Sequence, residues 1–424
     1  MERIGPSKEM MRYLPQLPLS ERDRRWEEIR KKMVMNGIDC LLLWGNDIFW
    51  DMGMVNFRYI TQVGSKMGGY GVFPIEGEPV VFSSPPHCNR PFSPFLSTQD
   101  WVKDVRAYTG LTGVVQQMSE MGFERSRIGV VGYGSVLAGH SVTYRDYVRI
   151  QEMMPKAIFS DFTTYIEEMR MIKSAEEIKM LIRAGEIGRK AIDTLITSAR
   201  PGVKECELYA DMVHTQIANG AEAQVFLLLT SGPIEGGDGG VKHLLHGIEQ
   251  PISPTTRELK EGDIVICEFH TAYGGYLAAT EFTVCVGKAP SQYKRIHDVS
   301  VECLYCSLEK MRPGTTLHEL WEAARGPVEK AGLDFVELGF HGHGMASPEF
   351  PTVVYRPQKG LLMSGDRIGD LVLKEGMVFG NNIDVYDPRW KMDVGHMYGD
   401  CVVIEANGPR RLVNVPDELP EVGV

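Results

Sequence analysis

The chain has 424 residues, of which 43% are apolar, and a formal net charge of −11. This length allows two domains with separate cores, and no apolar run approaches the length of a membrane-spanning helix. The acidic balance argues against a nucleic-acid-binding protein, which needs a basic surface. The N-terminal residues lack the apolar stretch of a signal peptide, and eight cysteines are too few for a disulfide scaffold. We therefore expect a cytoplasmic protein.

Strands alternate with helical stretches over residues 1–163, which predicts a smaller α/β domain. A helix is expected to begin with Ser20 as its N-cap and to end at Gly37. Buried strands are expected in IDCLLLWG and SRIGVVGYG, and a hairpin in GVFPIEGEPVVFSS.

A second domain, residues 164–424, is expected to begin with one amphipathic helix over 164–197, in which Ser174 and Glu177 form a capping box. More helices are expected in CELYADMVHTQIANG, around 291–312 and in PGTTLHELWEAARGPVEKAG. The chain then closes with three strand-like runs, ELGFHGHGMA, GMVFGNNIDVY and MYGDCVVIE. The CxxC pair of Cys303 and Cys306 is interpreted as two cysteines on one helix, because no second pair exists to complete a zinc site.

The segment CEFHTAYGGYLAATEFT, residues 267–283, has the pattern of a β-hairpin with a Gly-Gly turn. It carries Glu268, His270 and Glu281. Other ionisable residues gather in three places: His243 with His246, His341 with His343, and the stretch from Asp384 through Asp393 and His396 to Asp400. Histidines and acids that converge on neighbouring strands and Gly-rich turns indicate a functional site.

The order of these motifs resembles the "pita-bread" fold shared by methionine aminopeptidases, Xaa-Pro aminopeptidases, prolidases and creatinase. The resemblance covers nearly the whole chain and rests on NFRYIT, MIKSAEEI, KEGDIVI, GHG, PEFP and LKEGMVF. It implies an α/β (α+β) fold with a creatinase-type N-terminal domain and a C-terminal pita-bread catalytic domain. It also implies a homodimer in which one subunit's N-terminal domain lines its partner's site, so that Arg58 and Tyr59 would bind substrate there.

Peptidases of this family bind two metal ions through two Asp, one His and two Glu side chains. By the resemblance, these five positions fall on Glu268, Ala279, His343, Asn382 and Gly399. Two of these residues have no donor atom and Asn382 is neutral, so a pair of divalent ions is not expected. We predict no metal and no other cofactor. A single ion on Glu268, His343 and His270 stays open as an alternative.

The closer resemblance is to creatinase, a metal-free member that hydrolyses a C–N bond. We predict a metal-independent hydrolase of a small amide, amidine or cyclic nitrogen compound, and no peptidase activity. His246 or His343 would be the acid or base, while Glu268 and Glu281 would hold the substrate or attack it. The remaining candidate substrate-binding residues are Arg58, Tyr59, His270, His341, Asn382, Asp384 and His396.

Other interpretations remain open. The same fold would suit a lyase or decarboxylase of a small carboxylate, and a non-catalytic binding module is a third class. Glu268 would alternatively form a structural ion pair with Arg257 or with a neighbouring histidine, and His396 would pair with Asp393.

Overall fold

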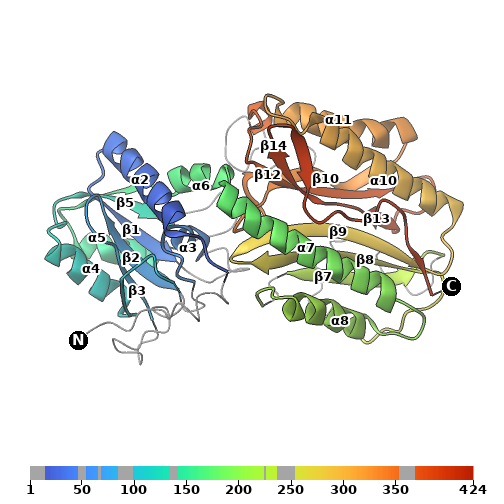
Figure 1. Ribbon diagram of the computed structural model, residues 1–424, viewed down its shortest axis with the longest axis horizontal. Helices are drawn as coiled ribbons and strands as arrows, with labels where there is room; N and C mark the ends of the chain where they lie inside the picture. Colours follow the sequence, from blue (N-terminus) through green and yellow to red (C-terminus); the bar gives the residue numbers. More distant parts are fainter. Residues whose placement is uncertain are drawn as a thin grey trace. The chain divides into compact units, whose positions relative to one another are not determined.

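The computed structural model describes residues 15–45, 54–64, 68–84, 99–133, 142–223, 226–235, 254–352 and 368–423. The chain divides into two compact units, Met1–Arg170 and Met171–Val424 (Figure 1). Both units combine helices with strands, as the sequence predicts.

The first unit is built on one six-stranded sheet with the order β4-β3-β2-β1-β5-β6. Its strands are β1 (Cys40–Gly45), β2 (Gly69–Pro74), β3 (Val80–Ser84), β4 (Asp104–Ala107), β5 (Arg127–Val131) and β6 (Ile158–Asp161). Strand β1 is the expected IDCLLLWG strand, and all its residues are buried because helices cover both faces of the sheet. It pairs antiparallel with β2 and parallel with β5.

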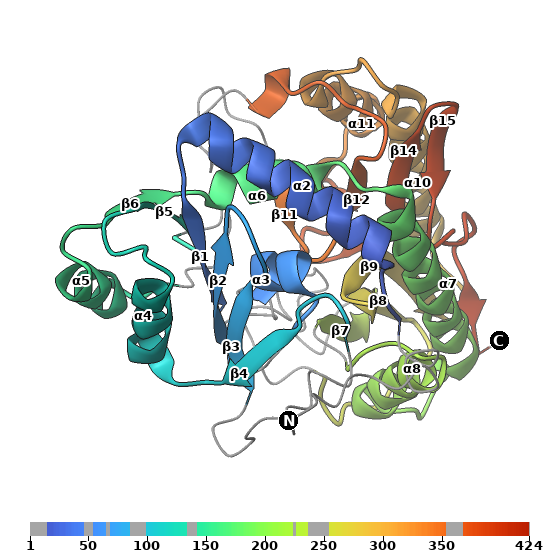
Figure 2. The ribbon, with the colours of Figure 1, turned by 60° about the vertical axis from the view of Figure 1, so that its left-hand side comes forward.

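Helices of the first unit lie on either side of this sheet (Figure 2). They are α2 (Leu19–Asn36), α3 (Val55–Thr61), α4 (Gly110–Glu120), α5 (Tyr144–Met153) and α6 (Thr163–Met171). The predicted cap of α2 is wrong, because Pro18 holds the N-cap position and Ser20 lies inside the helix. The predicted end is confirmed: Gly37 has φ 62° and its N–H donates to the carbonyls of the last turn.

The second unit contains two sheets. One has the order β11-β10-β12-β14-β15 with β13 beside β12, and the other has the order β16-β9-β8-β7. The strands are β7 (Leu227–Pro233), β8 (Asp263–Tyr273), β9 (Tyr276–Val286), β10 (Asp334–Gly342), β11 (Glu349–Thr352), β12 (Val378–Tyr386), β13 (Gly395–Met397), β14 (Cys401–Glu405), β15 (Gly408–Arg411) and β16 (Glu421–Val422).

Helices cover the outer face of each sheet in the second unit. Helices α10 (Ser291–Lys310) and α11 (Leu317–Ala331) contact β12 and β10. Helices α7 (Ala175–Ser198) and α8 (Glu205–Ala218) contact β9, β8 and β7 (Figure 1). A short 3₁₀ turn, η3 (Ile368–Asp370), packs on α11. These helices therefore leave the inner faces of the two sheets uncovered, so that the two faces can pack against each other.

The predicted hairpin of residues 267–283 is confirmed as β8 and β9. Gly274 and Gly275 form its turn with φ 61° and 82°, values that suit glycine. The single helix predicted over 164–197 is wrong, because the chain breaks after α6, where the Lys173 N–H donates to the Gly376 carbonyl. Ser174 and Glu177 then form the predicted capping box at the start of α7.

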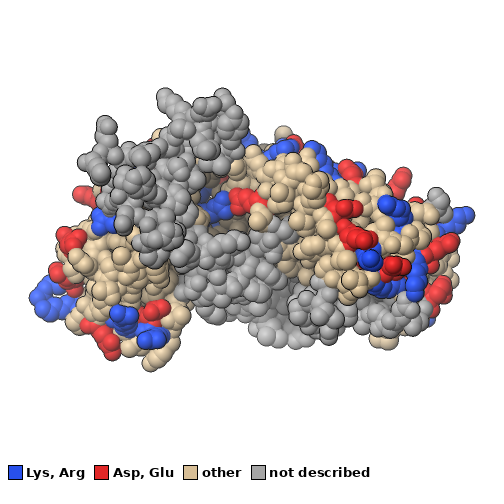
Figure 3. Space-filling model, turned by 90° about the horizontal axis from the view of Figure 1, so that it is seen from below, with Lys and Arg blue, Asp and Glu red and all other residues tan. Residues whose placement is uncertain are grey.

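On the face seen in Figure 3, Lys and Arg side chains are interspersed with Asp and Glu among the described residues. No helix in the described ranges is both long enough and apolar enough to cross a membrane.

Candidate functional site

One wall of the candidate site is the inner face of the β8–β9 hairpin. Glu268 pairs with Glu281 across the two strands, and His270 pairs with Ala279. Because side chains alternate along a strand, Glu268, His270 and Glu281 project from the same face. The opposite face, which carries Thr271, packs on α7 at Gly188.

The other wall belongs to β10 and β12. Glu337 pairs with Asp384, and two residues further along each strand Gly339 pairs with Asn382. His341 follows on the same face of β10. The two walls meet directly, since the backbone N–H of Ile383 donates to Glu281 Oε2 at 3.0 Å.

Four acids from the two walls form a carboxyl cluster: Glu268, Glu281, Glu337 and Asp384. All four are buried. Burial raises the pKa of Glu268 well above its ordinary value, and the nearby Glu337 raises it further. Burial also raises the pKa of Glu281, together with Glu268 and Glu337. The causes named for both shifts are burial and neighbouring carboxyl groups, opposed by hydrogen bonds, so the raised pKa values reflect the cost of charging several carboxyls in one buried place.

Asn382 connects the carboxyl cluster to the histidines. Its Nδ2 donates to Glu337 Oε2 at 3.4 Å. The same amide lies close enough to the Glu268 carboxyl to oppose the rise of its pKa, and close enough to the His341 ring to oppose the fall of its pKa. Glu281 Oε1, in contrast, is buried and has no hydrogen-bond partner among the described residues.

The second group of side chains is an imidazole cluster of His270, His341 and His343, joined by Ser347. Ser347 Oγ lies 3.0 Å from His270 Nε2 and 3.3 Å from His343 Nε2. The rings of His341 and His343 have centroids 4.5 Å apart. Ring stacking on Phe226, at a centroid distance of 4.4 Å, holds His270 from its other side.

All three imidazoles of this cluster are neutral at pH 7. Burial lowers the pKa of His270 to about 3, with a smaller contribution from His341. Burial lowers the pKa of His341 to about 4. The pKa of His343 also lies well below its ordinary value, because of burial and then its histidine neighbours. Each ring therefore keeps one nitrogen lone pair that can accept a proton, and burial makes it a weaker base than a free imidazole.

Close packing positions His343. A Cβ atom at Gly344 would lie 2.4 Å from Glu349 Oε1, and one at Gly342 would lie 2.7 Å from the Glu349 carbonyl. Glu349 in turn forms a buried ion pair with Lys173, with an N–O distance of 2.6 Å. The glycines on both sides of His343 are therefore required by the packing of the loop against Glu349.

The hydrogen bonds of the His396 ring lie outside both clusters. Its predicted partner was Asp393, but its ring bonds residues of α10 instead: Nε2 lies 3.0 Å from His297 Nδ1, and Nδ1 lies 3.0 Å from Ser300 Oγ. His297 extends this series of hydrogen bonds, because its Nε2–H donates to the Asp417 carbonyl at 2.9 Å. This is a buried polar network between β13 and α10.

The structure shows the surroundings of three other residues that the sequence analysis names. Arg257 does not pair with Glu268; it forms its ion pair with Asp263 at 2.6 Å. Tyr59 is fully buried in the first unit, with the Arg25 guanidinium 3.9 Å from its ring centroid. Arg58, in the last turn of α3, is half-buried. The substrate role of Arg58 and Tyr59 depends on a partner subunit and stays a prediction. His243 and His246 lie outside the described residues.

Sequence reasoning missed Glu337 and Ser347. Glu337 could have been found from the sequence, because it lies two residues before Gly339 and four residues before His341 on a predicted strand. This spacing places Glu337 on the same face of the strand as His341. Ser347 had no comparable signal. Its contact with His270 joins residues 77 positions apart.

The five positions that hold metal in the family do not hold a complete donor set here. Only Glu268 and His343 keep a metal-binding side chain, and a Cβ at Gly399 would lie 1.9 Å from the Asn381 carbonyl. The Glu281 carboxylate lies beside that position, with Oε2 3.1 Å from the same Cβ. Within the described ranges, no three His, Cys, Asp or Glu side chains are grouped closely enough to hold a metal ion. The residues present therefore do not fit the two-metal arrangement.

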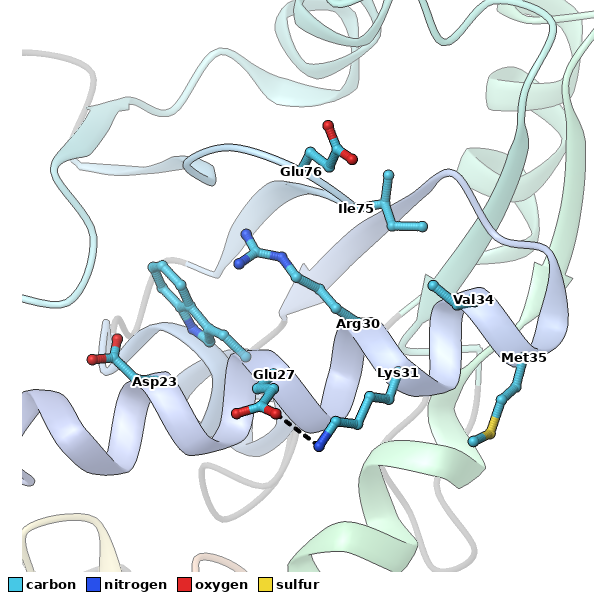
Figure 4. Close-up of a pocket in the computed structure, with 9 residues that line it drawn as sticks. Asp23, Glu27, Arg30, Lys31, Val34, Met35, Ile75 and Glu76 are labelled. Atoms are coloured by element: carbon cyan, nitrogen blue, oxygen red, sulfur yellow. Dashed lines mark ion pairs between the residues drawn. The ribbon is translucent and has the colours of Figure 1, made fainter.

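A groove of about 620 Å³ lies elsewhere, on α2 of the first unit (Figure 4). Its charged side chains are of both signs, and Lys31 pairs with Glu27 at 2.8 Å. It contains no histidine or cysteine. We do not assign chemistry to it.

Two family models match the chain. The model of metallopeptidase family M24 matches residues 179–406, and the creatinase/prolidase N-terminal domain matches residues 25–172. An Xaa-Pro dipeptidase of Pyrococcus horikoshii is 28% identical over 278 residues, which are 64% of this chain and 72% of the relative. An uncharacterized peptidase of Bacillus subtilis, YqhT, is 24% identical over 397 residues, which are 93% of this chain and 98% of the relative.

Solved structures share the fold. The prolidase of Pyrococcus horikoshii superimposes with a TM-score of 0.73 at 24% identity and covers 93% of this chain and 99% of its own. The X-Pro aminopeptidase of Thermotoga maritima gives 0.74 at 19% identity, with coverage of 94% and 99%. The predicted fold, a creatinase-type domain followed by a pita-bread domain, is confirmed.

The predicted activity is wrong. We expected a metal-independent hydrolase of non-peptide C–N bonds and no peptidase activity, by analogy with creatinase. The matching family is one of metallopeptidases, and the relatives named above are a dipeptidase and a peptidase. The error came from giving the substituted ligand positions more weight than the whole-chain similarity. The chain belongs to metallopeptidase family M24 and carries the creatinase/prolidase N-terminal domain.

Proposed function

We propose that the chain is a peptidase that hydrolyses short peptides of the Xaa-Pro type. Its membership of family M24 supports this class of reaction. Relatives from two Pyrococcus species that bear the name Xaa-Pro dipeptidase, at 28% and 27% identity, support the substrate class.

The observation that carries the proposal is the meeting of two chemically different clusters in one buried site. Asn382 touches both, through Glu268 on one side and His341 on the other. Buried carboxylates suit the ammonium group at a peptide N-terminus, because the charge pair is strong where water is excluded. Neutral imidazoles suit proton transfer at the neighbouring peptide bond.

In this arrangement, Glu281 and Glu268 hold the substrate ammonium group. An imidazole of the cluster accepts a proton as water attacks the peptide carbonyl, and the proton then passes to the leaving amine. Asn382 fixes the Glu268 carboxyl and the His341 ring. We also propose that the active form is a homodimer, as the family resemblance implies, which light scattering of the purified chain would test.

The test is a panel of dipeptides incubated with the full chain and analysed by mass spectrometry of the products. The panel compares Ala-Pro, Pro-Ala and Ala-Ala, each with and without added Mn²⁺, Co²⁺ or Zn²⁺. We expect release of free proline from Ala-Pro at the highest kcat/KM. Absence of cleavage of all three peptides under every metal condition would overturn the proposal.

A matched pair of variants separates the site from contaminating peptidases. His343→Ala removes an imidazole of the cluster and should abolish turnover. His318→Ala removes an exposed histidine of α11 and should leave turnover unchanged. Equal activity in both variants would assign the cleavage to another protein.

A further inference from the structure

The hydroxyl of Ser347 lies between two imidazoles. Its Oγ is 3.0 Å from Nε2 of His270 and 3.3 Å from Nε2 of His343. His270 comes from β8, and His343 follows β10, so Ser347 joins side chains from the two walls of the site. All three residues are buried. Water therefore does not compete for these hydrogen bonds.

A hydroxyl has one hydrogen to donate, and this limits which nitrogen of each ring can carry a hydrogen. If Ser347 donates to one Nε2, the second Nε2 must carry its own hydrogen and donate to Oγ. Two bare Nε2 atoms would leave one contact without a proton. Two protonated ones would both donate to Oγ and leave its hydroxyl hydrogen without an acceptor among the described residues. Opposite tautomers satisfy both contacts and the hydroxyl hydrogen, so they are the favoured arrangement while both rings are neutral.

The other ring nitrogen of His343, Nδ1, indicates which group donates each of these two hydrogen bonds. His343 Nδ1 is buried and has no partner among the described residues. A buried N–H without an acceptor is rarer in proteins than a buried acceptor without a donor. Nδ1 therefore holds a lone pair, and the hydrogen of His343 is on Nε2. The order of donors is His343 Nε2–H to Ser347 Oγ, and Ser347 Oγ–H to His270 Nε2, with the hydrogen of His270 on Nδ1.

We propose that Ser347 is a positioning residue that fixes His343 and His270 in opposite tautomers and so leaves His343 Nδ1 as the proton acceptor of the site. This deepens the proposed peptidase function and rests on it for the identity of the reaction. Ser347 acts through the two rings and not on the substrate. Without its hydroxyl, His343 is free to move its hydrogen to Nδ1, and the acceptor is lost.

Nitrogen-15 NMR of the full chain labelled at histidine tests the hydrogen positions without any substrate. We expect His343 to show a protonated Nε2 and a bare Nδ1, and His270 to show the reverse. In Ser347→Ala, both rings should change their tautomer populations. The same tautomer in both rings, or spectra unchanged by Ser347→Ala, would overturn the proposal.

Ser300→Ala is the matched control, because Ser300 also bonds a buried histidine, His396, at 3.0 Å. It should change the signals of His396 and leave those of His270 and His343 as they are. Ser347→Thr keeps a hydroxyl and should restore the tautomers, which separates loss of the hydroxyl from general disturbance of the loop.

Turnover of the dipeptide gives the second readout. Misplacing a reacting group by about 1 Å can cost roughly 100-fold, so we expect kcat of Ser347→Ala to fall by up to about that amount while KM stays within about threefold. Ser347→Thr should recover most of kcat. If Ser347→Ala alters the tautomers but kcat is unchanged, the positioning role is wrong although the peptidase function stands. If no dipeptide is cleaved at all, the peptidase function fails and the NMR result still decides the tautomers.

Discussion

Gly380 leaves the space that the His343 ring occupies: a Cβ atom at Gly380 would lie 2.3 Å from His343 Nε2. That contact is far inside van der Waals distance, so Gly380→Ala must displace the ring or the strand. We expect kcat/KM to fall by up to about 100-fold, the cost of displacing a catalytic group by roughly 1 Å. Gly326→Ala is the matched control, because a Cβ there meets nothing within 4 Å. Steady-state kinetics of the two variants would check this, and equal activities would contradict it.

The buried ion pair of Lys173 and Glu349 supports the loop that carries His343. Removal of one partner of a buried ion pair costs about 3–5 kcal/mol. We expect Lys173→Met and Glu349→Gln each to lower the free energy of unfolding by that amount. The double variant should lose less than the sum of the two. Urea unfolding of the four proteins completes the cycle, and additive losses would show that the residues do not interact.

Stability should fall on the acidic side because of the buried imidazoles. In the folded state the pKa of His270 is about 3 and that of His341 about 4, against 6.5 in the unfolded chain. A depressed pKa means that the unfolded state binds more protons below pH 6.5, so stability is lost as the pH falls from 6.5 toward 4. Each such histidine adds a slope of up to about 1.4 kcal/mol per pH unit.

The carboxyl cluster acts in the opposite direction. Burial raises the pKa of Glu268 and Glu281 above 4.5. Their contribution to stability is complete below pH 4.5 and is lost as the pH rises through their folded-state values. His341→Gln should therefore reduce the loss of stability, measured as the urea midpoint, as the pH falls from 6.5 to 4.5. Glu281→Gln should reduce the loss of stability as the pH rises above 4.5. Unchanged curves in both variants would mean that these groups are not buried.

The sequence predicted the elements of this site better than its contacts. The hairpin that carries Glu268, His270 and Glu281 was predicted correctly, because its strand pattern and its Gly-Gly turn are local properties of the chain. The bond between Asn382 and Glu337 depends on the pairing of β12 with β10 within one sheet. The position of Ser347 between two rings depends on how the two sheets pack. The cap of α2 failed for a local reason, since Pro18 supplies the extended conformation that Ser20 was expected to adopt.

Metal affinity should respond to restoring the missing donors. Ala279→Asp and Asn382→Glu would return carboxylates to two positions of the family's set, beside Glu268 and His343. We expect the double variant to bind Mn²⁺ at least tenfold more tightly than the unsubstituted chain, because oxygen donors dominate the affinity of hard divalent ions. Isothermal titration calorimetry measures this. The neutral pair Ala279→Asn and Asn382→Gln, of similar size, should bind no better than the unsubstituted chain, and equal affinities in all three proteins would contradict the prediction.

Glu281 should decide whether the substrate needs a free N-terminus. Its Oε1 is buried without a partner while Oε2 is held by the Ile383 N–H, so the carboxylate is fixed in place with one oxygen available. A charge-assisted bond from an ammonium group to that oxygen is worth about 1.5–3 kcal/mol, which is roughly 10- to 100-fold in KM. We expect Glu281→Gln to raise KM for Ala-Pro by that factor. N-acetyl-Ala-Pro, which has no ammonium group, should be a poor substrate of both proteins and should not distinguish them. Glu405→Gln, at the end of β14, is the control and should leave KM unchanged. An equal increase in KM for the free and the acetylated peptide would show that Glu281 shapes the site without binding the ammonium group.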